Sequence, residues 1–384
     1  MISRQDVQYL RGFLFFYSSS AAFIISFLPL YFEEIGLSGT KIGLLLAMGP
    51  FAALIFQPLW GYFSDKYQTI KKSILILLVG VAATAPLLFQ TTNVYLLLAY
   101  IAIFFSFFIP IGALGDSLAQ QTSMQYGNTF GSIRAFGSIG FAVTGIIGGY
   151  VLSAIGIKNI LFPYLFYTLV SLIIVIKVAD VKHEGRSISF SDTKKILKNK
   201  EFIFFIFFML FIAITHRAND TYLGLFISSI GGNESQVGWA WFVGASSEAI
   251  IFATSHYWLR YFKEITLIII AAILYSIRWF LFSIIDFPMG VIILQLFHGV
   301  TFGVFYLTGF QLVTNLLPKQ LYTTGHLFYT SFFFGLSGIA GSLIGGAVIE
   351  YSGTAQLYFY LGITALIGSI MLIIYKYMFF STST

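Results

Sequence analysis

The sequence predicts an all-α membrane protein with twelve transmembrane helices in two six-helix halves. The 384 residues are 58% hydrophobic and only 9% charged, whereas soluble domains carry about 25% charged residues. Many apolar runs are long enough to cross a bilayer, which takes about 20 residues of helix. Lys and Arg lie between these runs in the alternating pattern that sets membrane orientation.

Twelve apolar runs can be delimited along the chain. The first is longer than the roughly 7–15 residues of a signal-peptide core, so we expect a retained helix. One polar, basic stretch, residues 179–201, divides the chain into an N-terminal half (1–178) and a C-terminal half (202–384) and is predicted to be a cytoplasmic central loop. The runs are 10–32, 41–63, 72–90, 94–118, 129–153, 159–178, 202–230, 236–259, 264–284, 288–316, 323–350 and 354–379.

The loops have a strong charge bias. If both termini lie on one side of the membrane, sixteen of the 21 Lys and Arg residues lie on that side, and Lys41 and Lys158 lie on the other. Cytoplasmic loops carry the excess of Lys and Arg. We therefore expect a multi-pass protein of the cell membrane with both termini in the cytoplasm.

The composition also argues against several classes of protein. The net charge of +6 comes from loop residues and does not indicate nucleic-acid binding. With no cysteine, the chain has no disulfide framework and no thiolate metal site. It has no Walker motif, so we expect neither ATP-driven transport nor an enzyme, and no cofactor.

Six charged residues lie within or at the edge of the apolar runs. A charge in the middle of a membrane helix costs about 2.5–3.5 kcal/mol on insertion scales, so such residues mark ion or solute paths. Three acids balance three arginines, which indicates pairing around a polar cavity. The six are Asp116, Arg134, Arg217, Asp220, Glu248 and Arg278.

The loop after the second run carries a pattern that is typical of a gate. Gly61, Asp65 and Lys66 match G-x-x-x-D-[RK], the loop signature of the major facilitator superfamily. We expect Gly61 to permit close helix approach and Asp65 to accept from free amides at a neighbouring helix N-terminus. Lys66 would pair with acids or lipid phosphate. The simpler alternative is an ordinary positively charged cytoplasmic turn.

Asp116 and Arg134 are the best-placed charges of the N-terminal half, at the join of the fourth and fifth runs. An arginine and a carboxylate on adjacent helices can form a bidentate pair and can also open to bind a polar ligand. The alternative is a structural ion pair at the cytoplasmic face of the membrane.

The C-terminal half holds a second group of polar residues. Glu248, Arg278 and His298 lie at similar depth on three successive runs. Glu248 and His298 can each gain or lose a proton, so we expect the three to form a proton-coupling cluster. The alternative for His298 is a histidine that is hydrogen-bonded within a helix interface. Gln295 and Thr301 share a helix face with His298, and Gln295 is a candidate for solute contact.

The seventh run carries His216, Arg217 and Asp220. Arg217 and Asp220 are three residues apart, so they share one helix face and can pair with each other. Asp220 is the second candidate for a proton carrier, after Glu248.

At these residues the sequence resembles the lactose-permease and phenylpropionate-permease branches of the major facilitator superfamily. The likeness runs along most of the chain and is strongest in 115–141 and 248–307, which include Arg278-Trp279 and Gln295-Leu-Phe-His298. The resemblance implies twelve helices, proton-coupled uptake and a central site.

The resemblance also implies roles for individual residues. Asp116 and Arg134 match the carboxylate and arginine that bind sugar in lactose permease, and Arg278 and His298 match its coupling arginine and histidine. Two positions depart from that pattern. Thr301 stands where lactose permease has its proton-bearing glutamate, and Phe141 stands where lactose permease has the tryptophan of its aromatic platform. The proton carrier must therefore differ, and lactose is a doubtful substrate.

Together these features predict a monomeric, proton-coupled symporter for a small polar solute such as a sugar or glycoside. An aromatic carboxylate or a nucleoside is the alternative solute. A proton-antiport exporter of drugs or metabolites is an alternative function, and a lipid handler or a sensor without transport is a third.

Overall fold

A computed structural model describes residues 4–126, 130–180 and 196–380. Over these ranges the chain is helical and contains no strand. Twelve helices of the described chain are long and apolar enough to cross a membrane, and each overlaps one predicted run. The predicted fold class is therefore confirmed.

The described residues divide into two compact units. The first unit comprises those within Met1–Arg186 and Asn233–Phe242, and the second those within Ser187–Gly232 and Val243–Thr384. Of the predicted central loop, residues 181–195 lie outside the described part of the chain.

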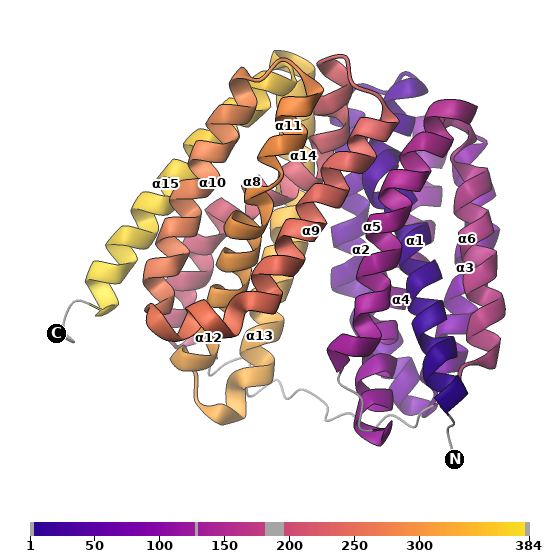
Figure 1. Cartoon of the computed structure of the whole chain (residues 1–384), viewed down its shortest axis with the longest axis horizontal. Coiled ribbons are helices and arrows are strands. Elements are labelled where there is room, and N and C mark those ends of the chain that lie inside the picture. Colours follow the sequence, from indigo (N-terminus) through magenta and orange to yellow (C-terminus); the bar gives the residue numbers. More distant parts are fainter. Residues whose placement is uncertain (1–3, 127–129, 181–195, 381–384) are drawn as a thin grey trace. The chain divides into compact units, whose positions relative to one another are not determined.

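The first unit is a bundle of six long helices (Figure 1). Helix α1 packs against α5 and α6, while α4 packs against α2 and α3. The unit also contains the first turns of α9, where Trp239 Nε1 donates to the hydroxyl of Tyr150 at 3.2 Å. The six helices are α1 (Arg4–Glu34), α2 (Gly39–Lys66), α3 (Ile70–Phe89), α4 (Val94–Tyr126), α5 (Phe130–Ile155) and α6 (Leu161–Lys177).

The second unit has the same number of membrane-length helices, but two of them are interrupted. Helix α8 packs against α14 and α15, and α10 packs against α12 and α15. The helices are α8 (Lys200–Ser229), α9 (Glu234–Trp258), α10 (Glu264–Ile284), α11 (Pro288–Leu294), α12 (Val304–Leu316), α13 (Tyr322–Thr330), α14 (Ser337–Ser352) and α15 (Thr354–Phe380).

Both interruptions are π-helical. Segment η3 (Gly299–Gly303) joins the span of α11 to α12, and η5 (Ser331–Leu336) joins α13 to α14. At η3 the Gly299 amide donates to the hydroxyl of Ser247 on α9 at 2.9 Å. Short π-helical turns often occur at functional sites, and η3 directly follows His298.

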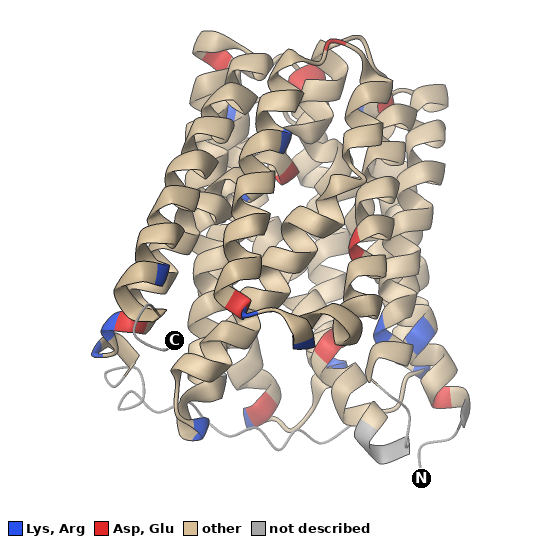
Figure 2. Cartoon of the chain, turned by 60° about the vertical axis from the view of Figure 1, so that its left-hand side comes forward, with Lys and Arg blue, Asp and Glu red and all other residues tan. Residues whose placement is uncertain are grey.

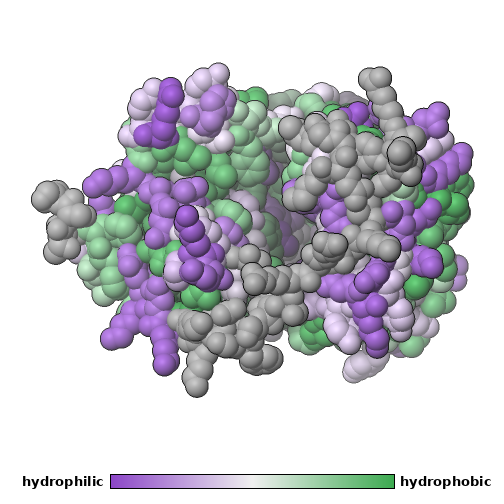
Figure 3. Space-filling view, turned by 90° about the horizontal axis from the view of Figure 1, so that it is seen from below, coloured by the Kyte–Doolittle hydropathy of each residue, from purple (hydrophilic) through white to green (hydrophobic). Residues whose placement is uncertain are grey.

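Most Lys and Arg residues lie toward the lower ends of the helices in Figure 2, and Figure 3 shows hydrophilic side chains on the face seen from below. In the first unit Lys66 ends α2, Lys71 lies in the first turn of α3 and Lys177 ends α6. In the second unit the basic residues at the corresponding helix ends are Lys200, Arg260, Lys263, Lys319 and Lys376. This distribution agrees with the predicted loop bias. Which face is cytoplasmic stays a prediction.

Small residues of α5 and α14 allow close helix packing, as their spacing predicts. A Cβ at Gly140 would lie 2.9 Å from the carbonyl carbon of Phe15 on α1, and one at Gly341 would lie 2.9 Å from the amide of Ala218 on α8. In both places the obstacle is backbone, so a side chain would force the helices apart.

The α1–α5 contact yields a stability prediction. We expect Gly140→Ala to destabilise the protein by about 1–3 kcal/mol, the usual cost of overpacking a well-packed core, and to lower the midpoint of thermal unfolding in detergent. Gly131→Ala is the control, because it lies on the same helix and its Cβ would meet nothing within 4 Å. Equal midpoints for the two variants would contradict the prediction.

Candidate functional site

The first unit contains the predicted cross-helix ion pair. Arg134 Nε on α5 lies 2.6 Å from Asp116 Oδ1 on α4, and the two side chains are 40% and 43% exposed. Exposed ion pairs contribute only about 0–1 kcal/mol to stability, so the pair can open at little cost. Gly137 leaves room for the guanidinium, since a Cβ there would lie 2.8 Å from Arg134 Nη1.

Phe141 lies two helical turns after Arg134, so the two residues share one face of α5. Its ring packs edge-on against Trp241 in the first turns of α9, with ring centroids 5.8 Å apart. The structure therefore places an aromatic pair on the α5 face that carries the arginine.

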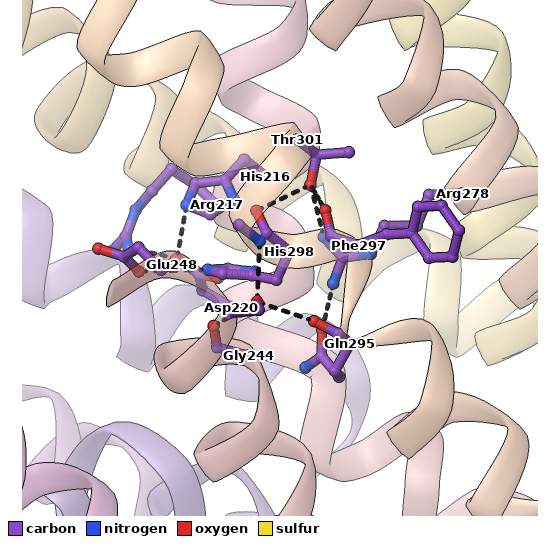
Figure 4. Close-up of polar contacts among 12 residues, drawn as sticks. His216, Arg217, Asp220, Gly244, Glu248, Arg278, Gln295, Phe297, His298 and Thr301 are labelled. Carbon is purple, nitrogen blue, oxygen red and sulfur yellow. Dashed lines mark hydrogen bonds and ion pairs between the residues drawn. The ribbon is translucent and has the colours of Figure 1, made fainter. Parts of the chain in front are cut away.

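Two of the three residues predicted to form the proton-coupling cluster meet in the second unit. His298 Nε2 lies 3.5 Å from Glu248 Oε2, and the side chains are 9% and 28% exposed (Figure 4). The pair joins α9 to the residue that precedes η3. An acid and an imidazole at this distance can exchange a proton after a small approach.

Arg278, the third predicted member, bonds to other groups. Its Nη1 donates to Thr301 Oγ1 at 3.0 Å and its Nη2 donates to Gln295 Oε1. The guanidinium also lies 4.7 Å from the ring centroid of Trp279, a favourable cation–π distance. All three contacts are to neutral groups, although Arg278 is only 2% exposed. The sequence predicts that Arg278 joins Glu248 and His298 in one cluster. In the structure Arg278 instead lies in a pocket formed by the neutral side chains of Gln295 and Thr301.

This pocket also explains what Thr301 does at the position where the resemblance to lactose permease implies a glutamate. Its hydroxyl accepts from Arg278 and donates to the carbonyl of Phe297 at 2.8 Å. Gln295, predicted to contact solute, is likewise 2% exposed and bonded to Arg278. Both side chains accept a hydrogen bond from the buried guanidinium of Arg278.

On α8, Asp220 is held by two neighbours. Its Oδ2 lies 2.8 Å from Arg217 Nη1 and 3.3 Å from His216 Nε2. The predicted Arg217–Asp220 pair is thus present. The sequence alone predicts no function for His216, although its i, i+4 spacing to Asp220 places both residues on one helix face.

The two histidines bring these pairs together. The rings of His216 and His298 have centroids 5.5 Å apart, and both pack against Phe302. We call this set of contacting side chains the acid–base row; it consists of Glu248, His298, His216, Asp220 and Arg217.

The predicted gate lies at the end of α2. A Cβ at Gly61 would meet no described atom within 4 Å. Lys66 Nζ lies over the rings of Tyr62 and Tyr67, 5.9 and 5.8 Å from their centroids. The gating roles of Gly61, Asp65 and Lys66 stay predictions.

The N-terminus of α3, next in the chain, is capped by two other residues. The side chain of Thr69 accepts from the Lys72 amide at 3.2 Å, and Asp180 Oδ1 accepts from the Lys71 amide at 3.1 Å. Asp180 follows α6, so this carboxylate ties the end of α6 to the start of α3.

Twelve membrane-length helices in the described chain, with ionisable groups paired inside the helix bundles, define a multi-pass membrane protein. The model of the MFS_1 like family matches residues 7–360, so the chain belongs to this major facilitator family. Its members are secondary transporters, and this protein is therefore a secondary transporter of small molecules and not an enzyme.

Relatives and solved structures agree with this assignment. The chain is 26% identical to maltose permease of Geobacillus stearothermophilus, over 97% of this chain and 94% of the relative. It is 24% identical to the "Probable 3-phenylpropionic acid transporter" of Escherichia coli (strain K12), over 80% and 82%. The crystal structure of nucleoside transporter NupG has the same fold, with a TM-score of 0.86 and 16% identity over 96% of this chain and 98% of that chain. The predicted resemblance is confirmed.

Proposed function

We propose that this protein is a proton-coupled symporter that imports a small polar organic solute across the cell membrane by alternating access. The termini lie in the cytoplasm and the protein works as a monomer. The observation that carries the proposal is the Glu248–His298 pair, in which a partly exposed carboxylate faces an imidazole inside membrane-length helices.

Glu248 suits the role of proton carrier for two reasons. Its side chain is 28% exposed, so it can exchange protons with water, whereas Asp220 at 12% is more enclosed. Its ionisable partner among the described residues is His298, whereas Asp220 is held by Arg217 as well as by His216. Glu248 with His298 therefore loads and releases the proton in this proposal, and Arg278 holds the surrounding helices through Gln295 and Thr301.

The solute would bind at Asp116 and Arg134. Hydroxyl groups of a sugar can donate to the carboxylate and accept from the guanidinium, and the apolar face of a sugar ring packs well on an aromatic side chain such as Phe141. Sugars and glycosides are therefore the leading class, and maltose and sucrose permeases are among the relatives of this chain. Aromatic carboxylates and nucleosides are the alternatives, in line with other relatives.

The test uses purified protein in liposomes with an imposed proton gradient, acidic outside. Labelled maltose, sucrose, 3-phenylpropionate and uridine represent the solute classes. We expect one class to accumulate against its gradient and to stop when a protonophore collapses the proton gradient. Accumulation that continues in the presence of the protonophore would overturn symport. Uphill movement of solute in the direction opposite to the proton flow would overturn it as well.

A further inference from the structure

Two carboxylates of the second unit, Glu248 and Asp220, lie at opposite ends of a pair of imidazole rings. Glu248 Oε2 lies 3.5 Å from His298 Nε2, and Asp220 Oδ2 lies 3.3 Å from His216 Nε2. The two rings are 5.5 Å apart between centroids, a gap that a ring rotation or one bridging water molecule can close. Figure 4 shows the residues side by side.

The remaining nitrogens of both rings are unused. Nδ1 of His216 and Nδ1 of His298 are buried and have no hydrogen-bond partner among the described residues, and the same holds for Asp220 Oδ1. Buried polar atoms in native proteins are normally paired, and each exception calls for an explanation. Each imidazole thus has one nitrogen at a carboxylate and one nitrogen available to receive or pass on a proton.

Starting from the proposed symport, we propose that His216 connects Glu248 to Asp220, so that the proton taken up at Glu248 is passed to Asp220. His216 then transfers the proton between His298 and Asp220. Asp220, the less exposed of the two carboxylates, is the end of the path. The proposal deepens the proposed function, because it adds a second carboxylate and a second imidazole to the coupling.

The transfer balances without any further reactant. Glu248 gives its proton to His298 Nε2, while His298 releases its Nδ1 proton toward His216 Nδ1. His216 in turn gives its Nε2 proton to Asp220 Oδ2. One proton has moved from Glu248 to Asp220, each imidazole is neutral again, and each has exchanged one tautomer for the other.

Arrival of the proton changes the ion pair on α8. A neutral Asp220 no longer holds Arg217 by charge, although the two lie 2.8 Å apart in the structure. The Arg217 side chain is 25% exposed and lies 5.8 Å from the ring of Phe334, so a released guanidinium is free to adopt another side-chain conformation. Proton transfer would in this way change the charge pairing of Arg217 on α8.

The surroundings of His216 include charges of both signs. Its ring lies between Phe302, in a parallel stack at 4.4 Å, and Tyr275 at 5.9 Å. On α15, Tyr358 donates to Asn219 beside Asp220. The charged and titratable groups around the ring are Arg217, Asp220, Glu248, Tyr275, Arg278 and His298.

The parallel stack on Phe302 offers a simpler role, in which His216 only fills space. His216→Phe separates the two roles, because it keeps an aromatic ring and removes both nitrogens. His216→Gln is the second variant, and it keeps a hydrogen-bond donor for Asp220 without offering a path through a ring. His326→Phe is the matched control: His326 stacks on Phe310 and bonds Thr314 outside the acid–base row.

The first measurement is transport in proteoliposomes with the probe that the wild type accumulates among maltose, sucrose, 3-phenylpropionate and uridine. We expect both His216 variants to lower proton-driven accumulation at least tenfold and to retain solute exchange at equal pH, and His326→Phe to behave as wild type. Accumulation within twofold of wild type in His216→Phe would overturn the path. Failure of the wild type to accumulate any probe would instead overturn the proposed symport.

The second measurement needs no solute. After a pH jump, infrared difference spectra of the full chain should show a carboxyl band that is missing in Asp220→Asn. We expect that band to form at least tenfold more slowly in His216→Phe and His216→Gln than in wild type. An unchanged rate in variants with a wild-type unfolding midpoint would overturn the path whatever the solute is.

Discussion

Replacing Glu248 with glutamine is expected to abolish proton-driven accumulation of solute while exchange of solute between the two sides continues. Glutamine has the shape of glutamate and can still bond His298, but it cannot take up a proton at physiological pH. A gradient of about one pH unit stores about 1.4 kcal/mol per proton, so a one-proton symporter accumulates solute about tenfold. We expect this ratio to fall to about one, as measured by labelled-solute uptake in proteoliposomes.

Glu264→Gln is the control for this prediction. Glu264 begins α10 and accepts from Asn315 at 2.9 Å at the exposed end of the unit, so its replacement should leave accumulation unchanged. If Glu248→Gln also accumulates solute like wild type, Glu248 is not the carrier, and Asp220→Asn becomes the decisive variant.

Replacing Arg134 with glutamine is expected to weaken solute binding about 10–100-fold, with little effect on folding. A hydrogen bond to a charged group is worth about 1.5–3 kcal/mol when its partner is enclosed, which corresponds to this range. The exposed Asp116–Arg134 pair contributes much less to the stability of the fold. Asp116→Asn should weaken binding similarly, and the double variant should not add the two losses, because both residues would hold the same solute.

Solute-dependent thermal shift measures the affinity, since a ligand that binds only the folded state raises the unfolding midpoint. Lys158→Gln is the control, because Lys158 forms an exposed pair with Glu34 at 3.2 Å in the same unit. Unchanged affinity in Arg134→Gln together with a large fall in the unfolding midpoint would show that the pair is structural, the alternative that the sequence left open.

The membrane-length helices were predictable because the bilayer imposes a length and a polarity on each span. The predicted run 288–316 and the observed span Pro288–Leu316 coincide, as do 264–284 and Glu264–Ile284. Local pairs were predictable for a similar reason. Arg217 and Asp220 are three residues apart on one helix, so helix geometry alone brings them together.

Contacts between distant helices were harder to predict. The sequence placed Glu248, Arg278 and His298 at one depth, but depth does not determine the direction in which a side chain points. The structure turns Arg278 toward Gln295 and Thr301, and only His298 reaches Glu248.

By itself, the sequence determined the class of this protein, its spans and the residues that carry charge into the membrane, because hydropathy and helix length depend on composition along the chain. The tertiary structure decided which charges meet. His216 and His298 are 82 positions apart in the printed sequence, and only the packing of α8 beside η3 brings their rings within 5.5 Å. The acid–base row exists because side-chain direction is set by helix packing, which no single stretch of sequence specifies.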